Sequence, residues 1–402
     1  MIAARIRQAR LIAGWSQDQL AERLSASGLP LTKAAISKYE TGKSIPTAQT
    51  ILKLAQVLKV RSEYFLTEPS LLVNWLAFRR HSTLSKAAQE RVMHYAAQVA
   101  ERQLELESLL YPDETPQFPP TQRVTTPDEA EAAAAALRHA WQLDEHPIDN
   151  LFQVVEDHGG VVVEWHEDIG EFDGLAGWGN AAAPLTVINM QVKADRRRFN
   201  LAHEIGHLLM DTHALTDKQE EKLAHRFAAA LLVPAAAAFR ELGSARRHID
   251  WRELGLLKQK YGMSMAAWIF RAKDLGIISE NTSTEMWQEL SANGWRKAEP
   301  FDYIGKEEPS RLKQMTLRAV AEGLISEDQG RIVCPDCFQD LPTPDKKPYP
   351  SARDLLRLPL EERNRIVAEM FEQSADEDFE IFEANGEADF DDEYTAAEYF
   401  ES

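Results

Sequence analysis

The chain has 402 residues, of which 44% are hydrophobic and 27% charged, so it is long enough for two or more domains with cores of their own. Its net charge of −19 argues against non-specific nucleic-acid binding by the chain as a whole, because phosphate contacts need local Lys and Arg. No N-terminal signal pattern and no apolar run of about 18 residues is found, which predicts a cytoplasmic protein with no membrane partner.

Residues 1–67 are predicted to form a small, positively charged helical domain. They contain ten Lys or Arg against four Asp or Glu, a local charge of +6. Helices are expected over Ile6–Ala13, from Ser16 and from near Thr32, with glycines marking their ends. The expected core of this domain comprises Ala21, Leu24, Ile36 and Tyr39, extended by Ile51, Leu54, Ala55 and Leu58.

Two segments of this domain, Ser16–Ala21 and Ala35–Lys43, resemble the Xre repressor-type helix-turn-helix. The resemblance implies binding to promoter DNA. The predicted contacts to the major groove are Thr32, Lys33, Ser37 and Lys38. Gln17 and Lys43 are expected to contact phosphates, which positions the domain without reading sequence. The alternative is a helical bundle that uses the same fold for protein contacts.

Residues 68–127 are predicted to be a helical connector followed by a proline-rich linker. The pattern is helical from Pro69 to Leu110 and ends in an amphipathic run, Lys86–Leu110. That run would pack within the chain or on a second copy, and a homodimer is the predicted assembly. Five prolines between Tyr111 and Pro127 predict a linker between independently packed parts.

Residues 128–324 are predicted to form an α+β domain. An Ala-rich helix is expected over Asp128–Trp141, followed by a β-branched run at Val161–Val163 and a strand at Leu185–Ile188. Most segments from Lys218 to Leu324 have helical patterns. Strands that precede a helical half are typical of α+β architecture.

The segment from Asn200 to Leu209 contains the pattern His-Glu-x-x-His. Asn200 is the expected N-cap of a helix. Residues four apart share one face of a helix, so His203 and His207 would present imidazole nitrogens to one metal ion, with Glu204 beside it. Two ordinary structural histidines are the alternative.

A third ligand is expected from the following helix, because residues 220–234 have an apolar face bordered by Glu221 and His225. Glu221 is the predicted ligand, and a surface carboxylate beside a packed histidine is the alternative. Two histidines and a carboxylate would leave one position on zinc open to water. Glu204 would then act as general base and acid, while His225 would orient Glu221 or stabilise the oxyanion.

Three segments, Asp173–Gly177, Arg198–His207 and Glu221–Pro234, resemble the ImmA/IrrE family of metallopeptidases. The resemblance implies a zincin-like fold, a Zn²⁺ ion held by His203, His207 and Glu221, and cleavage of repressors or similar regulator proteins. His225 stands where many members carry Asn. The predicted fold class is therefore multidomain: an all-α helix-turn-helix domain, an α+β zincin-like metallopeptidase domain and a partly disordered acidic C-terminal tail.

Residues 325–402 are expected to be an irregular segment followed by that acidic tail. Cys334 and Cys337 are predicted to be reduced loop thiols, since a structural zinc site needs about four ligands. From Ile366 onward fourteen acidic residues meet no Lys or Arg. The pattern Leu355 to Met370 is similar to C-terminal parts of some antitoxins. The apolar and aromatic residues of the tail would dock on a basic cleft of a toxin: Phe379, Ile381, Phe382, Phe390 and Tyr394. A solvated tail is the alternative.

Two functions follow from this organisation. The first is a DNA-binding regulator that is also a zinc-dependent endopeptidase, cleaving a regulator protein. The second is an autoregulating antitoxin that binds promoter DNA, neutralises a cognate toxin through its tail, and uses the zinc domain as a scaffold or sensor.

Overall fold

The computed structural model describes residues 2–76, 84–180, 182–338 and 358–375. The first domain has four helices: α1 (Ile2–Ile12), α2 (Gln17–Ala26), α3 (Lys33–Glu40) and α4 (Ala48–Leu58), followed by the 3₁₀ turn η1 (Ser62–Phe65). Ser16 and Thr32 cap α2 and α3 through their side chains, as the sequence pattern predicts. All eight expected core residues pack into one apolar cluster, which also contains Ile6, Leu20 and Phe65.

A mixed four-stranded sheet forms the centre of the second domain. Its order is β1 (Val73–Trp75), β4 (Gly174–Gly179), β5 (Ala183–Asn189) and β3 (Val161–Trp165). β4 pairs antiparallel with both β1 and β5, whereas β3 and β5 are parallel. The predicted strands at 161–163 and 185–188 are thus confirmed. The expected helix from Pro69 is wrong, because residues 73–75 pair with β4 instead.

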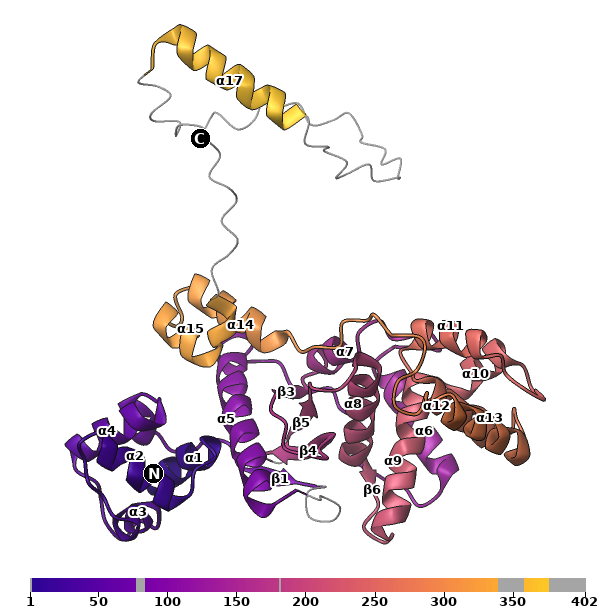
Figure 1. Cartoon of the computed structure of the whole chain (residues 1–402), viewed down its shortest axis with the longest axis horizontal. Coiled ribbons are helices and arrows are strands. Elements are labelled where there is room, and N and C mark those ends of the chain that lie inside the picture. Colours follow the sequence, from indigo (N-terminus) through magenta and orange to yellow (C-terminus); the bar gives the residue numbers. More distant parts are fainter. Residues whose placement is uncertain (1, 77–83, 181, 339–357, 376–402) are drawn as a thin grey trace. The chain divides into compact units, whose positions relative to one another are not determined.

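Each face of the sheet is buried by a different helix (Figure 1). Alternate residues point to opposite faces, so Val161 and Val163 join a cluster with α5 (Lys86–Leu110), while Val162 joins the core around α8 (Ala194–Leu209). The predicted bounds of the long helix α5 are confirmed. Its apolar face is used within the chain, against β3, α1 and α14 (Arg311–Ala321), and not left for a second copy.

The rest of the second domain is helical. Its elements are α6 (Pro127–Ala140), α7 (Leu151–Asp157), α9 (Asp217–Leu232), α10 (Ala235–Leu242), α11 (Trp251–Tyr261), α12 (Met265–Asp274) and α13 (Glu280–Ala292). The short strands β2 (Gln122–Arg123) and β6 (Met210–Asp211) pair in parallel, which anchors the proline-rich segment beside the end of α8. In the part of the chain that the structure covers, no helix alone is long and apolar enough to span a bilayer, although the bent pair α9 and α10 together meets that length and composition.

The segment after Ile325 is more ordered than expected. Ser326 and Gln329 form a capping box that starts α15 (Glu327–Val333), and the turn η2 (Pro335–Phe338) follows. The prediction of reduced cysteines is wrong here, because Cys334 and Cys337 form a disulfide across this turn. Further on, the chain forms the helix α17 (Leu360–Ala375), and the apolar tail residues from Phe379 onward lie outside the described residues.

A buried ion pair joins the first domain to α5. Arg5 donates from Nη1 and Nη2 to the two carboxylate oxygens of Glu101, at 2.7 and 2.9 Å. The Arg5 and Glu101 side chains are 3% and 7% exposed. Burial opposes the charged form of Glu101, but hydrogen bonds from Arg5 and Ser70 hold its pKa below the usual value. The pair therefore contributes stability above pH 4.5, which is lost as the carboxylate is protonated at lower pH.

Arg5→Ala is expected to destabilise the first domain by roughly 3–5 kcal/mol near neutral pH, because it leaves the Glu101 carboxylate buried without its cation. Urea unfolding of the full chain measures this loss. Arg7→Ala is the matched control, because Arg7 also lies on α1 and forms a more exposed ion pair with Glu90 of α5. This substitution should lower the free energy of unfolding by at most about 1 kcal/mol. Equal effects of the two substitutions would contradict the assignment.

Candidate metal centre

Helix α8 carries the His-Glu-x-x-His pattern, but it begins earlier than expected. Lys193 is its N-cap residue, so the predicted N-cap Asn200 lies in the helix and donates from Nδ2 to Asp173 Oδ1, at 3.2 Å. The extra turns form because their charged side chains find buried partners. Asp195 forms an ion pair with Lys258 at 2.8 Å. Arg198 forms an ion pair with Glu307, and these two side chains are fully buried.

Helix α9 brings Glu221 to the two histidines of α8. One ligand atom from each of His203, His207 and Glu221 lies within 4.8 Å of the other two. The two Nε2 atoms are 3.1 Å apart, and the Glu221 carboxylate oxygens lie 3.2 Å from His203 Nε2 and 3.5 Å from His207 Nε2. Two imidazole nitrogens and one carboxylate oxygen that converge on a point are a donor set suited to Zn²⁺.

This convergence depends on a close approach of α8 and α9. A Cβ atom at Gly206 would lie 3.0 Å from the ring of Phe227, so a larger residue would require this ring to shift by a few tenths of an ångström. Ala224 and Ala228 on the facing side of α9 are fully buried. Small residues at the contact therefore set the distance across which Glu221 reaches the histidines.

The surroundings of His203 and Glu221 favour the protonation states that a metal site requires. Burial lowers the pKa of His203 to about 4, which leaves its imidazole neutral near pH 7. Burial opposes the charged form of Glu221, but the hydrogen bond to His203 and the neighbouring histidines lower its pKa to about 2. A neutral imidazole and an ionised carboxylate are the forms that bind a cation.

Glu204 lies on the same helix, under the start of β4. Its side chain is buried, and burial raises its pKa to about 7. A Cβ atom at Gly174 would lie 2.8 Å from Glu204 Oε1, so β4 runs directly over this carboxylate. Among the residues with known positions, Glu204 Oε2 has no hydrogen-bond partner. A buried carboxyl with an unused oxygen and a pKa near neutrality is suited to proton transfer.

Two neighbours orient the histidines. Glu220 Oε1 lies 3.3 Å from His207 Nδ1, which leaves His207 Nε2 directed at His203 and Glu221. Burial alone would lower the pKa of His207, but the hydrogen bond to Glu220 and the nearby carboxylates raise it. His225 does not contact the Glu221 carboxylate: its Nδ1 lies 2.7 Å from the backbone oxygen of Glu221, and its ring stands edge-on to His203.

A cavity of about 580 Å³ lies beside the metal centre, on the side of His207. His207 and Glu220 line it together with residues from four segments: Leu76, Thr121, Arg123, Trp178, Leu208, Met210, Asp211, Thr212 and His213. Sequence reasoning did not find this lining, because only the fold brings the ends of β1, β2, β4 and β6 to one place. The orientation of His207 by Glu220 was also missed, although a carboxylate beside Glu221 was a visible signal.

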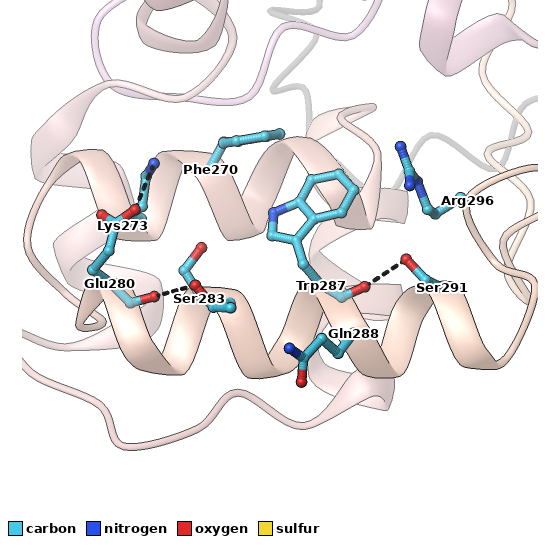
Figure 2. A pocket seen from close by; sticks show the side chains of 9 residues that line it. Phe270, Lys273, Glu280, Ser283, Trp287, Gln288, Ser291 and Arg296 are labelled. Atoms are coloured by element: carbon cyan, nitrogen blue, oxygen red, sulfur yellow. Dashed lines mark hydrogen bonds and ion pairs between the residues drawn. The ribbon is translucent and has the colours of Figure 1, made fainter.

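A second cavity, of about 620 Å³, lies between α12 and α13 (Figure 2). Phe270 and Trp287 form its aromatic wall, with ring centroids 4.8 Å apart, and Arg296 lies over the indole. Its carboxylate, Glu280, is paired with Lys273 at 3.7 Å. The described residues of this cavity include no group of metal ligands, so the candidate centre is the one on α8 and α9.

In the first domain, the predicted DNA contacts lie on α3 and at its ends. Thr32 caps the helix, and Lys33, Lys38 and Lys43 are exposed. Lys33 forms an ion pair with Asp18 at 2.6 Å. Gln17 donates to Glu40, which is itself held by the buried Arg10. Gln17 is thus tied to the packing of α1 against α3.

Comparison with known families agrees with this division of the chain. Residues 6–65 match the helix-turn-helix family model, and residues 161–273 match the peptidase family M78 model, described as an IrrE N-terminal-like domain. No curated protein matches the chain. The chain therefore joins an Xre-type helix-turn-helix domain to an ImmA/IrrE-like domain of a metallopeptidase-like hydrolase family. Neither model covers the residues that resemble antitoxin tails.

Removing the carboxylate that orients His207 is expected to weaken metal binding. Glu220→Ala should lower the affinity for Zn²⁺ by roughly 10–100-fold, as for other groups that orient a ligating histidine. Competition with a fluorescent zinc chelator measures this change. Glu285→Gln on α13 removes one negative charge far from the site and should leave the affinity unaltered. An affinity of Glu220→Ala equal to this control would refute the role.

Proposed function

We propose that this chain is a DNA-binding transcriptional regulator whose second domain is a zinc-dependent endopeptidase acting on a regulator protein. The convergence of His203, His207 and Glu221 on one point, with Glu204 beside it, is the observation that carries the proposal. When bound, Zn²⁺ would polarise the scissile carbonyl and lower the pKa of water. His203, His207 and Glu221 would hold the ion.

The chain's own residues would supply the proton transfers. Glu204 would accept a proton from the attacking water at its free oxygen and return it to the leaving amine. Burial supports this role, because a carboxyl with a pKa of about 7 both accepts and donates near neutral pH. His225, which donates from Nδ1 to the Glu221 carbonyl of its own helix, would stabilise the oxyanion of the tetrahedral intermediate from Nε2 in its imidazolium form, in which both ring nitrogens carry a proton.

The first domain would place this activity at a promoter. The exposed residues at the start of α3, Thr32 and Lys33, and those one turn later, Ser37 and Lys38, would enter the major groove. Gln17 and Lys43 would contact phosphates. Because α5 packs both on α1 of the first domain and on β3 of the second, DNA bound by the first domain would carry the second domain with it. The homodimer stays a prediction.

Glu204→Gln is expected to retain zinc and to lower peptide cleavage by roughly 10²–10⁴-fold, because the amide cannot accept the proton. The full chain is loaded with Zn²⁺ and incubated with a proteome-derived peptide library, and new N-termini are counted by mass spectrometry. Metal content by plasma mass spectrometry shows that the variant is loaded. Library cleavage that persists unchanged in Glu204→Gln, or zinc-loaded wild type without cleavage, would contradict the proposal.

Lys38→Ala is expected to lower the affinity for DNA by roughly 5–100-fold, the effect of losing one base contact in the major groove. The probe is a duplex selected by the full chain from a random-sequence pool, titrated by fluorescence anisotropy at fixed salt. Lys313→Ala on α14 removes one positive charge outside the first domain and is the control. If both substitutions weaken binding equally, α3 is not the reading helix.

A further inference from the structure

The strand β1 occupies the edge of the sheet beside the metal centre. Its three residues pair antiparallel with β4, Val73 opposite Gly179 and Trp75 opposite Gly177, and the Leu76 amide donates to the Ala176 carbonyl at 3.0 Å. β1 lies outside the residues that match the peptidase model. The strand that covers this edge is thus contributed by the connector that follows the first domain.

Without β1, β4 would be an edge strand running past the general base. The start of β4, at Gly174, lies against Glu204, whereas residues 177–179 at its other end pair with β1 on one side and β5 on the other. An unpaired edge offers a row of backbone donors and acceptors to any extended polypeptide, which adds as a further strand. The position that β1 holds is therefore the one that leads an extended chain toward Glu204.

We propose that β1 is an intramolecular occupant of the strand position through which an extended polypeptide substrate reaches the metal centre. The inference rests on the proposed endopeptidase function. It names the recognition mode, backbone pairing with β4, and a competitor for that position within the same chain.

The cavity at the metal centre supports this assignment. Leu76, the residue that follows β1, lines the same cavity as His207 and Glu220, and Trp178 of β4 lies on its wall. Leu76 therefore occupies part of the space in which substrate side chains next to the scissile bond would bind. β1 competes both for the backbone edge and for this space.

A single residue of the β4–β5 turn clamps the start of the strand. Asn180 has a φ of 46°, and its side chain accepts from the Leu72 amide at 2.9 Å and donates to the Ser70 carbonyl at 3.0 Å. Its own amide donates to the Leu72 carbonyl at 2.7 Å. The strand is held by three ladder residues, the Leu76–Ala176 hydrogen bond, this clamp and the packing of Val73 and Trp75 against the sheet cluster. It is short enough to be displaced.

The same segment is attached to the DNA-binding domain. Arg5 of α1 donates to the carbonyls of Thr67 and Glu68, at 3.1 and 2.9 Å, and Glu101 of α5 accepts from the amide and hydroxyl of Ser70. Contacts from the first domain therefore grip one end of a ten-residue run whose other end, Leu76, lines the cavity. A shift of α1 would pull directly on the strand.

The test uses a substitution that releases β1 from β4. The Asn180 amide donates to the Leu72 carbonyl and the Leu76 amide donates to the Ala176 carbonyl, so residue 74 is the hydrogen-bonded position between them in this antiparallel register, and Asn74→Pro removes its donor. Asn74→Ala is the matched control, because the side chain is exposed and the alanine keeps the amide. Both are made in the full-length, zinc-loaded Glu204→Gln chain, so that binding is read without cleavage.

The probe is a fluorescein-labelled peptide with the sequence of residues 68–76, followed by anisotropy. Asn74→Pro is expected to bind it at least tenfold more tightly than Glu204→Gln alone, and Asn74→Ala no more tightly. Equal affinities in all three chains would overturn the inference. If circular dichroism shows that Asn74→Pro is misfolded, Asn180→Gly replaces it, because glycine keeps the positive φ and removes the side-chain hydrogen bonds of the clamp. This variant is expected to bind the peptide at least threefold more tightly. No gain in affinity would overturn the inference.

Cleavage separates this inference from the proposed function. With Glu204 intact, Asn74→Pro is expected to cut the peptide library at least threefold faster than Asn74→Ala. Tighter peptide binding without cleavage in any zinc-loaded chain would support strand displacement and refute the endopeptidase. Cleavage that depends on Glu204, together with unchanged peptide binding and unchanged rate in the released variants, would refute the strand inference alone.

Discussion

The close contact between α8 and α9 is the constraint on which the functional half of the structure depends. Gly206 against the ring of Phe227 lets the helices approach until a carboxylate on one meets two imidazoles on the other. His203 is largely buried beside this contact and Glu204 lies under the start of β4, and burial shifts the pKa values of both. Geometry at the centre therefore depends on the packing of small side chains between two helices, and protonation depends on burial by α9 and β4.

The connector between the two domains is part of both. α5 packs on the sheet with one set of residues and on α1 with another, and β1 extends the sheet itself. The buried pair of Arg5 and Glu101 lies where these contacts meet, since Arg5 also holds the backbone at Thr67 and Glu68. Forces on the DNA-binding domain thus reach the sheet edge through hydrogen-bonded groups and without a flexible spacer.

Local patterns predicted the parts of the fold that are set locally. Capping residues such as Ser16 and Thr32 fixed the starts of α2 and α3, and the amphipathic period gave both ends of α5. The spacing of four between His203 and His207 was enough to expect a shared metal, because a helix places both on one face. Glu221 was predicted from an apolar pattern that α9 does follow.

Features that depend on distant partners were missed. β1 has three residues, too few for an alternating pattern, and its partner Gly179 is about a hundred positions away. The start of α8 was placed too late, because Asp195 and Arg198 favour helix only through Lys258 and Glu307, which come much later in the chain. The disulfide of Cys334 and Cys337 was missed because this region was expected to be irregular. The capping box at Ser326 starts α15, and the disulfide spans the turn that follows this helix.

The most direct test of this account is a crystal structure of the full chain grown with Zn²⁺, with anomalous data collected above and below the zinc absorption edge. The account predicts one strong anomalous peak bonded to His203 Nε2, His207 Nε2 and a Glu221 oxygen, with Glu204 near it and not bonded to it. A peak elsewhere, or no peak between α8 and α9 at stoichiometric zinc, would contradict the metal centre and the hydrolytic chemistry built on it.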